Sequence, residues 1–204
     1  MATDLFRFCR EHGEFRTLSG LPFLRLDLRY ASDQNFCGRN LYQGEQEAWL
    51  HREATEALER SAHALAIKRP GFRFRIYDAV RPLSVQAELF AAVAGTPRQA
   101  YVADPDRGSG HNYGLAVDLG LEDAEGVEQD LGTPFDTFDA LAQPQLEQSF
   151  FMQGRLNGTQ LELRRTLRSC MARGGFAQHA MEWWHFDLLP LEQMIGRYPR
   201  VEGT

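Results

Sequence analysis

The sequence predicts one α+β domain in which a mostly antiparallel sheet is flanked by helices. Two long stretches carry apolar residues at helical spacing, and short stretches of alternating polar and apolar residues lie before, between and after them. The 204 residues are 43% hydrophobic and 11% aromatic, which is enough to bury one core without disulfides. Since no linker or repeat divides the chain, we expect residues 1–204 to form a single domain with its core at about residues 23–188.

The predicted strands are short and rich in apolar residues. Leucines at every second position of residues 23–28 share one face, and residues 72–77 (FRFRIY) alternate in the same way. Residues 115–121 (LAVDLGL) form the next strand, and the last one lies within residues 176–188. Between these two strands, residues 122–130 are acidic and are expected to form a turn or hairpin.

The helices are predicted from apolar residues that recur every three or four positions. The expected helices are residues 45–67, 83–93, 160–173 and 191–197. Pro70 ends the first of them, and Gly174 with Gly175 closes the third. The segment 95–110 is rich in Gly, Pro and Asp, so it is expected to be a long loop, and long loops in compact domains are usually functional or mobile.

The charge of the chain excludes one class of partner. It has 22 Lys and Arg against 28 Asp and Glu, a formal net charge of −6. Binding along a nucleic-acid backbone needs clustered cations, so we expect no nucleic-acid partner.

Cysteine usage and hydropathy predict where the protein works. Cys9, Cys37 and Cys170 are odd in number, widely spaced and without a CxxC pair, which favours a reducing compartment. The first fifteen residues have no basic start and no long apolar run, and no stretch approaches the ~18 apolar residues of a spanning helix. We expect a cytoplasmic protein, with export to the periplasm by a route other than Sec left open.

Two pairs of residues stand out as candidates for chemistry. Asp118 interrupts an apolar strand, where a carboxylate is costly unless it is paired or binds a metal, and His111 precedes it across an Asn-Tyr-Gly turn. Each alone is more simply a satisfied polar residue. Glu182 and His185 are three apart with two tryptophans between them, so a regular strand would point them to opposite faces. A bend is therefore needed for both to reach one site.

Two histidines and a carboxylate are what a catalytic zinc site needs, because three protein ligands leave one position for water or substrate. The zinc peptidase motif HExxH is absent. A separate carboxylate must move the proton of the water, and Glu182 is the natural choice. A cation would stabilise the developing oxyanion, and Arg81 follows the 72–77 strand and is fixed by Pro82. The alternative for Arg81 is an ordinary surface arginine.

Five blocks of sequence together resemble the zinc D-alanyl-D-alanine dipeptidases of the VanX type. The blocks occur in the order of that family, and the similarity runs from about Leu26 to Leu188. They are Arg29-Tyr30-Ala31 with Asn35-Phe36-x-Gly38, Asp78-Ala-Val-Arg81-Pro82, Ser109-x-His111-x6-Asp118, Gly132-Thr-Pro-Phe-Asp136 and Glu182-Trp183-Trp184-His185.

The resemblance implies an α+β metallopeptidase fold and hydrolysis of the D-Ala-D-Ala dipeptide. It implies one zinc ion bound by three ligands, a catalytic base, an arginine that stabilises the tetrahedral intermediate, and residues near the substrate carboxylate and amine. His111, Asp118 and His185 match the zinc ligands, Glu182 matches the catalytic base, and Arg81 matches the stabilising arginine. Ser109 matches the residue near the substrate carboxylate, and Asp136 matches the residue near the amine. One departure concerns Asn112-Tyr113, which replaces a Ser-Arg pair of resistance-type members and affects the expected substrate preference.

Three functions therefore remain open at this point. The first is a D-Ala-D-Ala dipeptidase, and the second is a carboxypeptidase or endopeptidase that cuts longer cell-wall peptides. The third is a non-catalytic zinc-containing binding domain, against which Glu182 and Arg81 argue because a structural zinc site needs neither. The absence of an export signal and a wall-binding repeat favours the first over the second.

Overall fold

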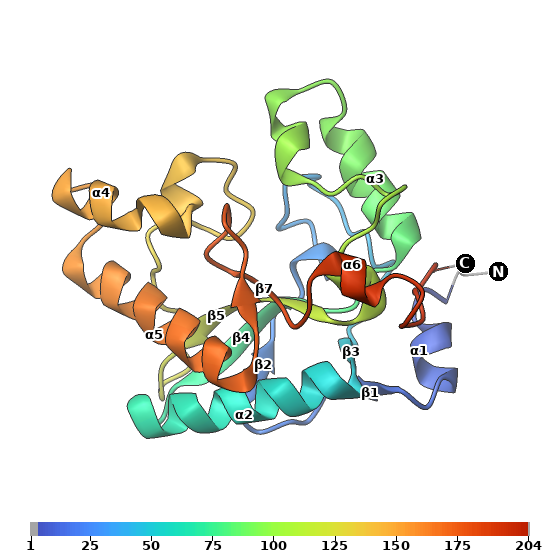
Figure 1. The fold of residues 1–204 in the computed structure, drawn as a ribbon, viewed down its shortest axis with the longest axis horizontal. Coiled ribbons are helices and arrows are strands. Elements are labelled where there is room, and N and C mark those ends of the chain that lie inside the picture. Colours follow the sequence, from blue (N-terminus) through green and yellow to red (C-terminus); the bar gives the residue numbers. More distant parts are fainter. Residues whose placement is uncertain (1–3, 204) are drawn as a thin grey trace.

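The computed structural model describes residues 4–203, and at its centre lies a five-stranded mixed sheet with the strand order β2-β4-β5-β7-β6 (Figure 1). The strands are β2 (Leu24–Leu26), β4 (Arg73–Asp78), β5 (Ala116–Glu122), β6 (Ala177–Gln178) and β7 (His185–Asp187). Strand β2 runs parallel to β4, and the other neighbours are antiparallel. The predicted α+β class with a mostly antiparallel sheet is confirmed.

The helices surround this sheet. They are α1 (Arg7–Glu11), α2 (Arg52–Lys68), α3 (Leu83–Val93), α4 (Glu147–Met152), α5 (Gly158–Gly174) and α6 (Leu191–Met194). The two long helices α2 and α5 pack against each other and against the sheet, whereas α3 and α4 lie on the far side of the sheet from α2 (Figure 1). The face of the sheet toward α2 and α5 is thus covered by the two longest helices.

The start of α2 differs from the prediction. The helical spacing at residues 45–67 predicts a helix from residue 45, but α2 begins at Arg52. The preceding residues Trp49–His51 form strand β3, which pairs antiparallel with β1 (Phe15–Thr17). Pairing with a distant segment thus overrides the local helical pattern, and the His51 side chain caps α2 by accepting a hydrogen bond from the Glu53 amide.

Most other elements keep their predicted places. Helix α3 has the predicted bounds, and α5 is slightly longer than predicted at both ends. The final strand at residues 176–188 proves to be two strands, β6 and β7, with a bent segment between them. The predicted helix 191–197 ends at Met194, because Ile195 is extended. The acidic segment at 122–130 turns back on itself as expected, through a bridge between Glu122 and Glu128.

The buried side chains form one hydrophobic cluster that reaches from Leu5 to Val201, beyond the expected core of residues 23–188. We propose on this ground that the chain is a single domain. His51, which caps α2, is 1% exposed and belongs to the buried polar residues. Within residues 4–203, no helix combines the length and the apolar composition that crossing a membrane requires.

Candidate active site

Two neighbouring strands and the 3-10 helix before them bring the candidate metal-binding residues together. Asp118 on β5 pairs with Asp78 of β4 on one side and with His185 of β7 on the other. Directly paired residues of antiparallel strands have Cβ atoms about 4.5–5.5 Å apart, so strand register alone brings Asp118 and His185 together. His111 comes from the short 3-10 helix that immediately precedes β5.

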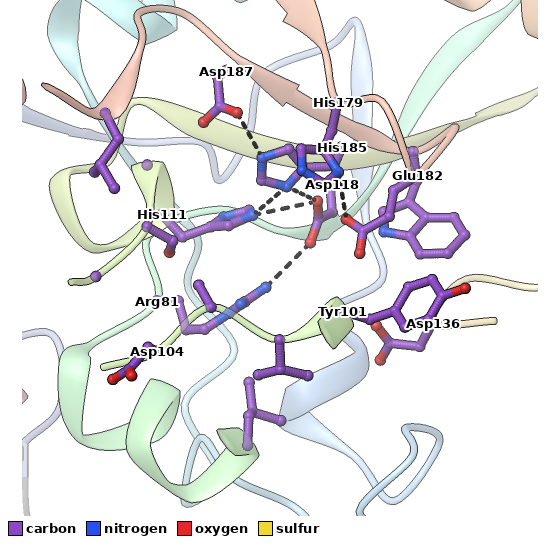
Figure 2. A pocket seen from close by; sticks show the side chains of 18 of the residues that line it. Arg81, Tyr101, Asp104, His111, Asp118, Asp136, His179, Glu182, His185 and Asp187 are labelled. Carbon is purple, nitrogen blue, oxygen red and sulfur yellow. Dashed lines mark hydrogen bonds and ion pairs between the residues drawn. The ribbon is translucent and has the colours of Figure 1, made fainter. Parts of the chain in front are cut away.

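The donor atoms of these residues converge (Figure 2). His111 Nε2 lies 3.1 Å from His185 Nδ1 and 3.3 Å from Asp118 Oδ1, and the latter two atoms are 2.9 Å apart. Among residues 4–203, no other set of three or more His, Cys, Asp or Glu gathers its donor atoms in this way. The three residues are those expected from the sequence to bind zinc.

The far nitrogen of each histidine has a partner that fixes the ring. His111 Nδ1 donates to the Ala79 carbonyl at 2.7 Å, which leaves the Nε2 lone pair facing the other donors. His185 Nε2 lies 2.9 Å from the Asp187 carboxylate. Metal-binding histidines almost always carry such a carbonyl or carboxylate partner. The donor set and its supports therefore fit a metal ion.

The charges around the group favour a cation. Burial raises the pKa of Asp118, but the rings of His111 and His185 outweigh it and hold this pKa well below the ordinary value. Burial lowers the pKa of His185, but Asp187 and Asp118 outweigh it and hold this pKa well above the ordinary value. The carboxylate of Asp118 among the donor atoms, and that of Asp187 behind the His185 ring, thus place negative charge around the group.

Asp187 is a functional candidate that the sequence reasoning missed. The signal was present, because His185 and Asp187 are two apart on β7 and so share one face. The 3-10 helix leaves room for this carboxylate only because it begins with a glycine: a Cβ on Gly110 would overlap Asp187 Oδ1. Asp187 therefore helps to orient the His185 ring, which supplies one of the donor atoms.

Replacing Asp187 by Asn should weaken metal binding. The amide keeps the shape of the side chain but loses the charge that makes the His185 ring a better ligand. We expect the metal dissociation constant to rise about 10–100-fold, measured by competition with a chromophoric chelator. Glu192→Gln, at the exposed rim of the same cavity, is the matched control and should bind metal as the wild type does.

Glu182 lies in the bent segment between β6 and β7, which is the irregularity that the three-residue spacing requires. Its carboxylate faces the same cavity as the three donors (Figure 2). Burial raises the pKa of Glu182 to about 7, the range that suits a group that takes and returns a proton near neutral pH. The nearby His179 lies with Nδ1 3.8 Å from this carboxylate and outside the donor set.

Arg81 is buried and lines the cavity, so the alternative of a surface arginine is wrong. Its guanidinium donates to Asp78 at 2.8 Å and to Asp118 Oδ2 at 3.3 Å. The fully buried Asn112 donates to the Arg81 carbonyl at 2.7 Å, and its own oxygen accepts from the Ser109 amide at 2.7 Å. Asn112, where the chain departs from resistance-type members, therefore connects the backbone of Arg81 to the backbone of Ser109.

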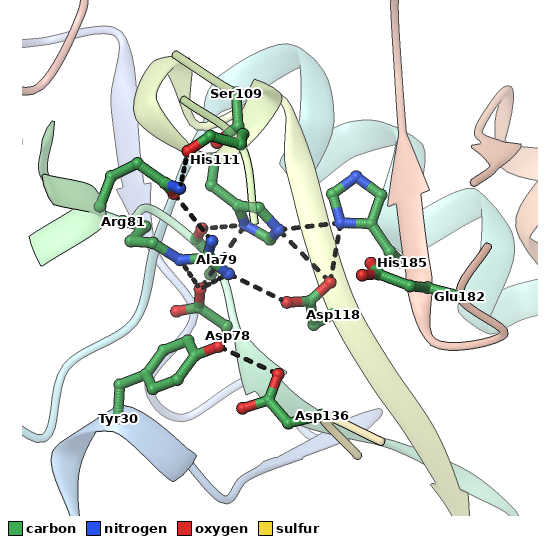
Figure 3. Close-up of polar contacts among 12 residues, drawn as sticks. Tyr30, Asp78, Ala79, Arg81, Ser109, His111, Asp118, Asp136, Glu182 and His185 are labelled. Atoms are coloured by element: carbon green, nitrogen blue, oxygen red, sulfur yellow. Dashed lines mark hydrogen bonds and ion pairs between the residues drawn. The ribbon is translucent and has the colours of Figure 1, made fainter. Parts of the chain in front are cut away.

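Ser109 and Asp136 both line the cavity, on opposite sides of the donor set (Figure 3). Asp136 Oδ1 accepts from the Tyr30 hydroxyl at 3.1 Å. Its Oδ2 is shielded from solvent and has no hydrogen-bond partner within the described residues. Burial raises the pKa of Asp136 well above its ordinary value, and its left-handed backbone (φ 61°) is strained for a residue other than glycine. A buried carboxylate in this state suits a cationic ligand.

The cavity has a volume of about 510 Å³. The 95–110 segment, expected from the sequence to be a long loop, forms part of the cavity wall, since residues from Ala100 to Gly110 line the cavity. The two tryptophans divide their roles. Trp184 lines the cavity, whereas Trp183 packs in the core and donates its indole N–H to Thr133 at 2.8 Å.

A site in which two strands and the 3-10 helix before them present two histidines and a carboxylate to a cavity, with a further glutamate beside them, defines a metallopeptidase. The chain belongs to the D-Ala-D-Ala dipeptidase family of peptidases. The sequence model of peptidase family M15, described as D-ala-D-ala dipeptidase, matches residues 16–201, nearly the whole of the described structure.

Curated relatives support the same assignment. The chain is 35% identical over 167 residues to the D-alanyl-D-alanine dipeptidase of Escherichia coli K12, covering 82% of this chain and 80% of the relative. A Streptomyces coelicolor protein of the same name is 38% identical over 195 residues, and one from Enterococcus faecium is 27% identical over 184 residues. Both of these matches cover 81% of this chain and 86% of the relative.

Proposed function

We propose that this chain is a zinc dipeptidase that hydrolyses free D-Ala-D-Ala to two molecules of D-alanine. One observation carries the proposal: along a single cavity, three metal-donor atoms lie between an unpartnered oxygen of Asp136 and the hydroxyl of Ser109 (Figure 3). The names of the relatives support the substrate. Two nitrogens and one oxygen suit zinc, and three protein ligands leave a position open for water or substrate.

Glu182 is the proton carrier of the proposed reaction. A zinc ion held by His111, Asp118 and His185 supplies Lewis-acid chemistry, which activates water and polarises the peptide carbonyl. The Glu182 carboxylate takes a proton from the attacking water, whose oxygen forms a bond to the carbonyl carbon. Glu182 then gives that proton to the leaving nitrogen as the C–N bond breaks, so no further co-reactant is needed.

Arg81 provides fixed positive charge beside the reacting carbonyl. Its guanidinium is already oriented by Asp78 and Asp118, so no reorganisation is required when negative charge develops on the carbonyl oxygen. The ring of Tyr30 lies over the same guanidinium, 5.1 Å from its carbon. This preorganisation is what a transition-state stabiliser needs.

The two ends of the cavity set the length of the substrate. The ammonium group of the dipeptide pairs with Asp136, supported by Tyr30, and the terminal carboxylate lies at Ser109. A site built to bind both termini discriminates strongly against a substrate that lacks one, because buried polar groups then stay unpaired. Free dipeptide is available in the cytoplasm, which is where we propose that the enzyme works.

Asp136→Ala should remove the preference for a free amine. We expect kcat/KM for D-Ala-D-Ala to fall about 10–100-fold, the effect of losing one charged hydrogen bond. For N-acetyl-D-Ala-D-Ala we expect kcat/KM to be low already in the wild type, and Asp136→Ala should not lower it by the same factor. Measuring both substrates with the same enzyme preparation checks this, and an unchanged ratio between them would show that Asp136 does not read the amine.

A panel of three substrates tests the function as a whole. D-Ala-D-Ala, L-Ala-L-Ala and a cell-wall pentapeptide ending in D-Ala-D-Ala are incubated with the zinc-loaded protein, and released alanine is separated by chromatography. The proposal predicts rapid release from D-Ala-D-Ala alone. Equal kcat/KM for the pentapeptide and the dipeptide would instead identify a carboxypeptidase, and no release from any substrate would favour a binding domain.

A further inference from the structure

A buried arginine that does not line the cavity holds the loop that carries Asp136. Arg164 lies in the middle of α5 and is fully buried. Its Nε donates to the Leu131 carbonyl at 2.6 Å, and its Nη1 donates to the Leu141 carbonyl at 2.9 Å. These carbonyls stand at the two ends of the segment 131–141, which we call the Asp136 loop.

The cost of burying Arg164 indicates that these two contacts matter. Among residues 4–203, no carboxylate forms an ion pair with its guanidinium; burial lowers its pKa to about 10, and the more distant Glu147 and Asp130 offset this only in part. A buried cation without an ionic partner is unfavourable unless its hydrogen bonds compensate. The two hydrogen bonds of this guanidinium both go to the backbone of one loop, and its Nη2 has no hydrogen-bond partner within residues 4–203. The planar, forked guanidinium can reach two carbonyls at once, which a lysine cannot do.

Further contacts tie the same loop to its surroundings. Gln160, one turn before Arg164 on α5, donates to Asp130 at 2.7 Å just before the loop begins. Within the loop, Thr133 accepts from the Trp183 indole, in the segment that also carries Glu182. The loop thus has a fixed position relative to both α5 and the candidate base, although Asp136 itself holds a strained backbone.

We propose that Arg164 is a positioning residue for substrate recognition: by bridging the two ends of the Asp136 loop, it holds the Asp136 carboxylate where it reads the free amine of the dipeptide. Arg164 touches neither substrate nor metal, so it acts only through the loop. The inference rests on the proposed function, because it concerns the amine end of that substrate.

Arg164→Lys tests the proposal. The neighbouring exposed Arg165→Lys is the matched control, since within residues 4–203 the only hydrogen bond of the Arg165 side chain goes to Gln148. In Arg164→Lys we expect KM for D-Ala-D-Ala to rise about tenfold with kcat within twofold, and the preference for free over N-acetylated dipeptide to fall about tenfold. Zinc content should stay at the wild-type level. Thr133→Val, which removes one hydroxyl, should shift the same ratio in the same direction by less.

A double substitution separates positioning from general destabilisation. If Arg164 acts through Asp136, adding Arg164→Lys to Asp136→Ala should change the amine preference no further, whereas independent effects would add. Amide hydrogen exchange should accelerate in residues 131–141 of Arg164→Lys and not in the sheet. Unchanged KM and amine preference in both Arg164→Lys and Thr133→Val, or a loss confined to kcat, would overturn the proposal. A wild-type protein that does not cleave D-Ala-D-Ala would refute the proposed function instead. In that case, amide hydrogen exchange in residues 131–141 would by itself test whether Arg164 holds the loop.

Discussion

Glu182→Gln should retain its metal and lose most of its turnover. Glutamine keeps the size and hydrogen-bonding capacity of the side chain but cannot take a proton from water. General-base catalysis contributes about 10²–10⁴-fold, so we expect kcat for D-Ala-D-Ala to fall by that factor with little change in KM. The rate is measured as D-alanine release, and zinc is measured in the same samples by elemental analysis.

Glu192→Gln is the control for this change, because Glu192 also lines the cavity but is exposed at its rim. It should turn over substrate at close to the wild-type rate. If Glu182→Gln binds zinc fully and turns over as fast as Glu192→Gln, the proton carrier is another group. His179, with Nδ1 3.8 Å from the Glu182 carboxylate, would then be the first residue to test.

His185→Ala should abolish zinc binding and activity together. This ring supplies one of the three converging donor atoms, and its removal also leaves the carboxylates of Asp118 and Asp187 without the ring that lies between them and contacts both. A ligand bound at about 1,000 times its dissociation constant stabilises the native state by ~4 kcal/mol. For a domain of this size, losing that contribution should lower Tm by about 10 °C in calorimetry with zinc present.

The control for the metal prediction is His179→Ala. The His179 ring lies 5.3 Å from that of His185 and lines the same cavity, but it is not one of the converging donors. It should keep one zinc per chain and the Tm of the wild type. Stoichiometric zinc in His185→Ala would show that the ligand set has been assigned wrongly.

The residue types and motifs are sufficient to single out His111, Asp118 and His185, and the structure brings their donor atoms together. The need for a bend before His185 also follows from spacing alone, because strand side chains alternate with a period of two. The same alternation places Asp187 on the same face of β7 as His185, so its position beside the site could also be predicted from the sequence. These features are local in sequence, so a single chain reveals them.

The features that the sequence does not reveal depend on contacts between distant segments. Residues 45–51 have helical spacing, yet Trp49–His51 pair with Phe15–Thr17 as strands. Nothing near Arg164 in the sequence indicates that it donates to Leu131 and Leu141, and nothing near Trp183 predicts its bond to Thr133. Local periodicity reports which face of an element is apolar, but it does not report which distant backbone the element meets.

The most direct test of the account is a zinc titration of the metal-free protein with D-Ala-D-Ala as substrate. Zinc is removed with a chelator, and D-alanine release is followed as zinc is returned in steps. We predict no release from the metal-free protein and a linear rise that saturates at one zinc per chain, while Glu182→Gln binds the same amount of zinc and stays inactive. Full D-alanine release from the metal-free protein, or full turnover by zinc-loaded Glu182→Gln, would contradict the account.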